Sequence, residues 1–171
     1  MLAAVYARAS VTFEDPFYAR IARRTLDYVL REMTGDGGAF FSAQDAEVNE
    51  REGQNYLWTA EQIDETLDAA GLSEEKPFVR SVYAVGDDPR GGNFQDPHHP
   101  EDGFRYVLEM RARPGALAQQ IGTTTDALLG RLDRVNAALY EARMKRDQPG
   151  TDDKVLAGWN GLMIGAMSAA G

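Results

Sequence analysis

The chain has 171 residues, no cysteine and a formal net charge of −9 at pH 7. Its length suits one domain with a sizeable core, and the lack of cysteine excludes a disulfide framework, a thiol nucleophile and a cysteine-ligated zinc site. The negative charge argues against an extended nucleic-acid-binding surface, and no apolar run approaches the roughly 18 residues that a membrane-spanning helix needs. No basic segment precedes the first apolar residues, so we expect no signal peptide and a cytoplasmic location.

The N-terminal part of the sequence predicts two helices. Residues 1–9 are apolar and small, which is typical of the tail of a helix. Asp15 followed by Pro16 is a favourable helix start. From there to Met33 apolar residues recur every three or four positions, and a glycine-rich turn beginning at Gly35 ends the pattern.

Strand signals and a further helix follow. The aromatic-rich runs 39–44 and 55–58 flank the polar stretch 45–53, so we expect a β-hairpin with a long tip. Thr59 and Gln62 then form the capping box of the next helix.

The second half is expected to be helical around one long loop. Gly, Pro, Asp and Asn dominate residues 86–103, and each favours turns. Residues 104–110 are expected to form a short strand or an extended connection. The expected helices cover residues 74–83, 116–122, 123–146 and a final apolar stretch from about 154. No strand–helix–strand order appears, so we predict a mainly α fold of antiparallel helical hairpins with a small β-hairpin.

Two motifs invite a metal site but fit it poorly. Asp45, Glu47 and Asn49 alternate as calcium ligands do, yet Glu50 and Tyr56 occupy the positions where a calcium loop needs glycine and glutamate. The only histidines are adjacent in a loop rich in proline and aspartate, at 98 and 99, which favours a solvated loop over joint metal binding. We therefore expect no metal and no cofactor.

Three carboxylates are the candidate catalytic residues: Asp45, Asp152 and Asp153. Two carboxylates held about 5–10 Å apart can hydrolyse a glycosidic bond, one as acid and the other as base or nucleophile. The competing interpretation is structural, with Asp153 capping the last helix and Lys154 as its ion partner.

Four further side chains are candidates for substrate binding: Tyr56, Trp58, Trp159 and Asn160. Their aromatic rings offer apolar faces to the C–H surfaces of a sugar, and the amide can hydrogen-bond to hydroxyl groups. In the competing interpretation Trp159 is only a core residue.

Three segments carry a resemblance to a known family: GGAFFSAQDAEVNEREGQNYLWT (37–59), GGNF (91–94) and DDKVLAGWNGLMI (152–164). They resemble the thioredoxin-domain-containing family that includes spermatogenesis-associated protein 20 and its bacterial and archaeal relatives. The chain departs from the family pattern at Glu47, where the family has aspartate, and at Ala157, where it has threonine. Gln54 and Asn55 replace a usual Lys-Phe pair.

The resemblance implies a thioredoxin-like domain followed by a toroid of helical hairpins, an (α/α)6 barrel like that of six-hairpin glycosidases and N-acylglucosamine 2-epimerases. Residues 1–171 would then be a fragment of the toroid, and the thioredoxin-like domain would lie outside this chain. The implied function is carbohydrate processing, by glycoside hydrolysis or sugar epimerisation, on a sugar or sugar-derived small molecule. The alternative is a non-catalytic ligand- or partner-binding module. We also expect self-association through exposed apolar faces at 1–9 and 156–170, and binding to neither nucleic acid nor membrane.

Overall fold

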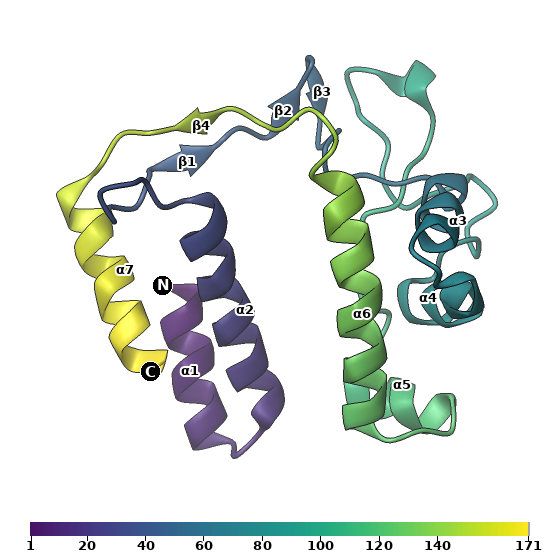
Figure 1. Cartoon of the computed structure of the whole chain (residues 1–171), viewed down its shortest axis with the longest axis horizontal. Helices are drawn as coiled ribbons and strands as arrows, with labels where there is room; N and C mark the ends of the chain where they lie inside the picture. Colours follow the sequence, from purple (N-terminus) through teal and green to yellow (C-terminus); the bar gives the residue numbers. More distant parts are fainter. Residues whose placement is uncertain (171) are drawn as a thin grey trace. The chain divides into compact units, whose positions relative to one another are not determined.

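The structure is a computed structural model that describes residues 1–170. It is mainly helical, with 54% of residues in helices and small antiparallel strand pairs. The chain divides into two compact units (Figure 1). The terminal unit comprises Met1–Asp45 together with the chain from Gly150 onward, and the central unit comprises Ala46–Pro149. None of the helices in residues 1–170 is long and apolar enough to cross a bilayer.

Three helices and one strand pair make up the terminal unit: α1 (Leu2–Thr12), α2 (Pro16–Glu32), α7 (Ala157–Ala170), β1 (Ala43–Gln44) and β4 (Thr151–Asp152). The predicted start of α2 is confirmed, since the Asp15 carboxylate accepts a hydrogen bond from the Phe17 N–H at 2.9 Å and Pro16 is the first helical residue. Helix α1 packs against both α2 and α7. The buried core between them is small and centres on Ala3, Leu26 and Ala166.

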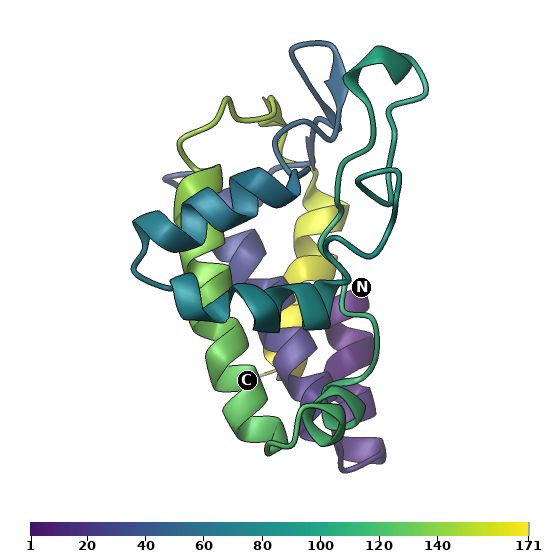
Figure 2. The same cartoon turned by 90° about the vertical axis from the view of Figure 1, so that its right-hand side faces the viewer.

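The central unit holds the larger core. Its elements are β2 (Glu47–Val48), β3 (Arg51–Glu52), α3 (Ala60–Ala69), α4 (Lys76–Tyr83), α5 (Pro114–Gln120), α6 (Thr125–Arg143) and two short 3-10 turns at Ser73–Glu75 and Pro100–Asp102. Helix α3 runs across α6 (Figure 2). Helix α6 buries Leu128, Leu132, Val135 and Leu139 along one side. The capping box at Thr59 and Gln62 is present in both directions.

The predicted pairing of residues 39–44 with residues 55–58 is wrong. Strand β1 pairs with β4 instead, and β2 pairs with β3 in a tight hairpin. Asn49 and Glu50 connect β2 to β3 with φ values of 53° and 60°, the left-handed conformation that suits a two-residue hairpin turn. The polar stretch therefore closes on itself, while Trp58 forms a bridge with Tyr106.

Several helix boundaries also differ from the expectation, including those of α5, which spans Pro114–Gln120 rather than residues 116–122, and the start of α4, which is Lys76 rather than residue 74. Helix α6 ends at Arg143 rather than near residue 146, and α7 begins at Ala157 rather than near Lys154. Between the two helices, Thr151 and Asp152 pair with β1, and the Lys154 N–H donates to the Asp152 side chain. These backbone groups are already hydrogen-bonded outside a helix, so α7 begins only after them.

Candidate functional site

Two of the predicted carboxylates share one face of the β1–β4 pair. The register places Ala43 opposite Asp152, and the Asp45 N–H donates to the Gly150 carbonyl at 2.7 Å. Because side chains alternate along a strand, Asp45 and Asp152 project from the same face as diagonal neighbours. The Cα atoms of such diagonal neighbours are about 7–8 Å apart in an antiparallel pair. The opposite face is directed toward α2, since Gln44 Oε1 accepts a hydrogen bond from the Tyr28 hydroxyl at 2.8 Å.

Asp152 has a defined electrostatic environment. The Lys154 ammonium lies 3.0 Å from Asp152 Oδ2, and the Lys154 N–H donates to Oδ1 at 3.3 Å. The hydrogen bond from the Lys154 ammonium, followed by that from its N–H, lowers the pKa of Asp152. Lys154 is therefore the ion partner of Asp152 rather than of Asp153. Asp153 is exposed, and by strand alternation it falls on the opposite side from Asp152.

Asn160 serves as a clamp on the backbone within the terminal unit. Its Oδ1 accepts the Phe40 N–H at 2.8 Å, and its Nδ2 donates to the Phe40 carbonyl at 2.9 Å. Both ends of the amide are thus used to hold the turn before β1 against α7. Trp159, one residue earlier on α7, is 56% exposed and lies outside the core.

The two predicted binding residues of the central unit have different environments. Trp58 is only 4% exposed, and the Arg146 guanidinium lies 3.9 Å from the centroid of its ring. Tyr56 is at the surface, with the Arg143 guanidinium 4.5 Å from its ring centroid. Each ring therefore already has an arginine guanidinium over one face, from the end of α6 or from the segment after it.

Sequence reasoning missed a polar pocket of about 510 Å³ that lies within the central unit. It is formed by the β2–β3 hairpin, the start of α3, the 94–105 loop and the segment after α6. Most lining side chains are amides, carboxylates or cations, and only Leu57 and Phe94 are large and apolar. The lining residues are Asn49, Arg51, Glu52, Gln54, Asn55, Leu57, Gln62, Phe94, Asp96, Asp102, Gly103, Arg105, Lys145, Arg146 and Asp147.

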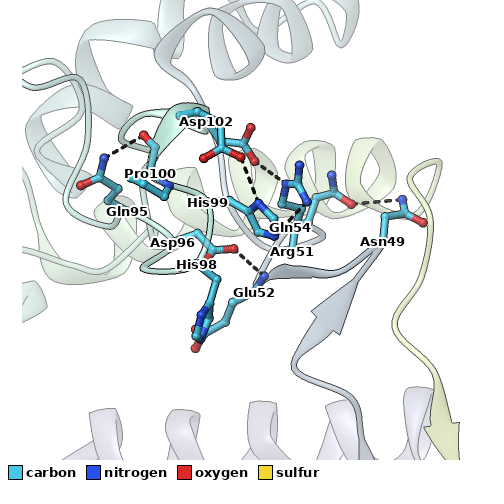
Figure 3. A network of polar contacts seen from close by, with 11 residues as sticks. Asn49, Arg51, Glu52, Gln54, Gln95, Asp96, His98, His99, Pro100 and Asp102 are labelled. Atoms are coloured by element: carbon cyan, nitrogen blue, oxygen red, sulfur yellow. Dashed lines mark hydrogen bonds and ion pairs between the residues drawn. The ribbon is translucent and has the colours of Figure 1, made fainter.

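One wall of this pocket is a network around Arg51 (Figure 3). Arg51 Nε donates to Asp102 Oδ2 at 2.6 Å, and its Nη1 lies 3.0 Å from His99 Nε2. His99 Nδ1 lies 3.0 Å from a carboxylate oxygen of Glu101. Since arginine only donates, His99 must accept at Nε2 and carry its proton on Nδ1, which these partners assign. His99 is thus half-buried in a network rather than solvated, while His98 is exposed as expected.

Asp96 is a buried carboxylate that binds backbone N–H groups. Its Oδ2 accepts the Glu52 N–H at 3.0 Å, and its Oδ1 accepts the His98 N–H at 2.8 Å. Burial alone would raise the pKa of Asp96, but the backbone N–H groups of His98, Glu52 and His99 together lower it. Asp96 therefore ties the 94–105 loop to β3 as a carboxylate.

The GGNF segment supports the same wall through its backbone. A Cβ on Gly92 would overlap the backbone of Arg105, so this position accepts only glycine. Asn93 clamps Val107 in both directions, accepting its N–H at 2.7 Å and donating to its carbonyl at 3.1 Å. Phe94 and Arg105 then exchange two backbone hydrogen bonds. The sequence shows the two glycines but not which distant backbone approaches them.

Among residues 1–170, no three histidine, aspartate or glutamate side chains are grouped so that they would hold a metal ion. The acidic and histidine side chains around the pocket bind arginine and backbone N–H groups instead.

Comparison with known proteins finds relatives but no matching family model. The chain is 29% identical over 181 aligned residues to spermatogenesis-associated protein 20 of Mus musculus and of Homo sapiens. The chain is homologous to one segment of that protein. Each alignment covers 99% of this chain and 23% of the relative, so the chain spans less than a quarter of the relatives' length. An uncharacterized protein of Caenorhabditis elegans is 25% identical over 144 residues, covering 79% of this chain and 20% of that protein.

Proposed function

We propose that the chain contributes to carbohydrate processing, either glycoside hydrolysis or sugar epimerisation of the N-acylglucosamine 2-epimerase kind. The observation that supports this proposal is the placement of Asp45 and Asp152 on one face of the β1–β4 pair. The Cα atoms of such diagonal neighbours are about 7–8 Å apart, a spacing from which two side chains can reach the roughly 6.5–9.5 Å that separates the carboxyl groups of inverting glycosidases.

The two carboxylates are assigned different roles. Lys154 keeps Asp152 ionised, which suits a base that removes a proton from water or from a sugar carbon. Asp45 then acts as the acid that donates a proton to the leaving oxygen. Trp159, exposed on α7 of the same unit, is the proposed apolar platform for the sugar.

The finer architecture belongs to the same proposal. We assign α1 and α2, which pack against each other and are joined by a short turn, as one antiparallel hairpin of an (α/α)6 toroid. Homology to a segment of a longer protein is compatible with a toroid that continues outside this chain and with a thioredoxin-like domain in the longer relatives.

The test uses two assays and matched aspartate variants. Hydrolysis of aryl glycosides and interconversion of N-acetylglucosamine with N-acetylmannosamine are measured for the chain and for Asp45→Asn and Asp152→Asn. Each of these variants should lower kcat about 100-fold or more, the scale of a lost acid or base. Asp153→Asn, adjacent in sequence but on the other side of the strand, is the control and should retain activity. Equal losses in Asp152→Asn and Asp153→Asn, or no turnover of any sugar, would contradict the proposal.

The second candidate is a non-catalytic ligand-binding module, favoured by the polar pocket of the central unit. This pocket has the size typical of small-molecule sites, about 300–1,000 Å³. Saturable binding of a small molecule without turnover, unaffected by Asp45→Asn and Asp152→Asn, would decide for this alternative.

A further inference from the structure

Arg146 is a half-buried cation in the central unit with no carboxylate partner among residues 1–170. Its Nη1 donates to the backbone carbonyls of Asn55 at 3.0 Å and of Leu57 at 2.7 Å, and its Cζ lies over the Trp58 ring. Burial, with a smaller effect of the neighbouring Arg143 charge, lowers the pKa of Arg146. A partly desolvated charge of this kind is usually neutralised by an opposite charge.

The other edge of the Arg146 guanidinium is open. Its Nε and Nη2 donate to no acceptor in the described part of the chain, and no side-chain nitrogen that lacks a partner there is buried. These two atoms are therefore accessible, on a residue that lines the pocket. The contact with Trp58 and the two hydrogen bonds to carbonyls hold the guanidinium in place, so the Nε–Nη2 edge is a preorganised fork for two oxygens of an oxyanion.

Two further cations line the same pocket without an ion pair. Lys145 is exposed, and its ammonium has no hydrogen-bond or ionic partner within residues 1–170. The Arg105 guanidinium donates its one hydrogen bond to the Phe104 carbonyl beside it, at 3.0 Å, and lies near enough to the Glu61 carboxylate to interact with its charge without forming an ion pair. The pocket therefore offers three cations, including Arg146, to a ligand.

The carboxylates that line the pocket have other partners or are exposed to water. Asp102 is ion-paired with Arg51, and Asp96 is satisfied by two backbone N–H groups. Asp147 accepts a hydrogen bond from the Asn49 amide at 2.9 Å and, like Glu52, is exposed to water. Water stabilises those two exposed charges, whereas the Arg146 charge is partly shielded from water.

We propose that this pocket binds a polar small molecule through an oxyanion group, a phosphate or a carboxylate, which sits on the free edge of Arg146 with Arg105 and Lys145 beside it. The proposal involves residues of the central unit alone and does not depend on Asp45 or Asp152. Its failure and the failure of the proposed carbohydrate chemistry are therefore distinguishable.

Binding is measured by titration calorimetry and thermal shift on the 171-residue chain with four probes: inorganic phosphate, glucose 6-phosphate, gluconate and glucose. We expect saturable binding of at least one anionic probe, weakened as salt is raised, and none of glucose. Binding of the phosphates alone identifies a phosphate group, and binding of gluconate alone identifies a carboxylate. Either result supports the proposal. No saturable anion binding, or equal affinity for glucose and glucose 6-phosphate, would overturn it.

Charge variants give the second readout. Arg146→Lys keeps the charge but loses the fork, and should weaken anion binding about tenfold. Because Arg146 also holds backbone carbonyls, Arg105→Gln and Lys145→Gln are tested beside it, and each should weaken binding about threefold to tenfold. Arg80→Gln, a solvent-exposed arginine on α4 that does not line the pocket, is the matched control. Unchanged affinity in both Arg105→Gln and Lys145→Gln would refute the assignment even if Arg146→Lys failed to fold.

Discussion

The terminal and central units differ in how completely they bury their apolar side chains. In the central unit α3, α4 and α6 bury a continuous set of side chains, and Leu67, Val79 and Leu128 have no exposed surface. In the terminal unit α7 is almost wholly apolar, yet Leu162 is 55% and Ile164 is 60% exposed. An apolar sequence therefore predicts a helix in both units, but burial requires a matching face from another element, which only the central unit supplies in full.

The largest expected effect is on the stability of the central core. Leu128→Ala removes a completely buried side chain and should lower the free energy of unfolding by about 2–5 kcal/mol. Leu162→Ala, the same change on exposed α7, should cost less than about 0.5 kcal/mol. Urea denaturation followed by the helical circular-dichroism signal, to which both units contribute, measures both changes. Equal effects of the two leucine changes would remove the contrast between the units.

Two asparagine clamps provide a finer comparison, one in each unit. Asn160 binds both backbone groups of Phe40, and Asn93 does the same for Val107. Asn160→Ala leaves a partly buried N–H and C=O unpaired and should destabilise the chain by about 1–3 kcal/mol. Asn93→Ala acts on exposed hydrogen bonds and should cost about 1 kcal/mol or less.

Thermal melting of the two alanine variants, with Asn160→Asp as a partial replacement, measures this difference. The aspartate keeps the acceptor but loses the donor, so it should fall between wild type and Asn160→Ala. If Asn160→Ala melts like the wild type while sugar binding is lost, Asn160 is a ligand-binding residue rather than a clamp.

The sequence predicted what depends on neighbouring residues. The caps at Asp15 and Thr59 act within three positions, and each is present. The Asn49–Glu50 turn acts just as locally, but the longer aromatic runs around it suggested a different hairpin. Strands β2 and β3 have only two residues each, which is too short to show the alternation of apolar and polar residues that identifies a strand in a sequence.

The sequence could not predict what depends on distant residues. Ala43 pairs with Asp152 across more than half of the chain, and nothing in either segment specifies the other. The polar pocket likewise takes residues from Asn49 to Asp147. The motif residues Gly92, Asn93 and Asn160 hold backbone segments together. Residues that belong to a family motif can therefore have a structural role, and the motif alone does not identify them as catalytic.

The exposed apolar faces of the terminal unit should produce self-association. Leu162 and Ile164 on α7 and Val5 on α1 are all more than half exposed. We expect Leu162→Lys with Ile164→Lys to weaken association about tenfold, equivalent to about 1.4 kcal/mol. Sedimentation equilibrium over a range of concentrations is the measurement, and Val107→Lys in the central unit is the control. A wild-type chain that stays monomeric at every concentration would contradict this expectation.

The smallest expected effects concern two similar aspartates, one in each unit. Asp88 accepts the Arg90 N–H at 2.9 Å and two guanidinium hydrogen bonds at 3.0 and 2.6 Å, and these lower its pKa to about 2. Asp152 accepts the N–H and ammonium of Lys154, also two positions ahead, and its pKa is lowered too. The arginine fork makes two side-chain bonds where lysine makes one. We therefore expect Arg90→Gln to raise the pKa of Asp88 more than Lys154→Gln raises that of Asp152.

The pKa values of Asp88 and Asp152 are measured from their carboxyl chemical shifts, followed by NMR between about pH 1.5 and about pH 6. A depressed pKa stabilises the folded state above the unfolded value of 3.8, and this stabilisation is lost as the pH falls through about 2 for Asp88. Both side chains lie at the surface, so the effect on folding is small and the pKa itself is the informative quantity.

If Asp152 is the base of the proposed reaction, Lys154→Gln should also move the acidic limb of the pH–rate profile to higher pH, because a base with a raised pKa is protonated sooner as the pH falls. An Asp152 pKa that rises while that limb stays fixed would remove Asp152 from the base role and leave its pairing with Lys154 a structural feature of the terminal unit.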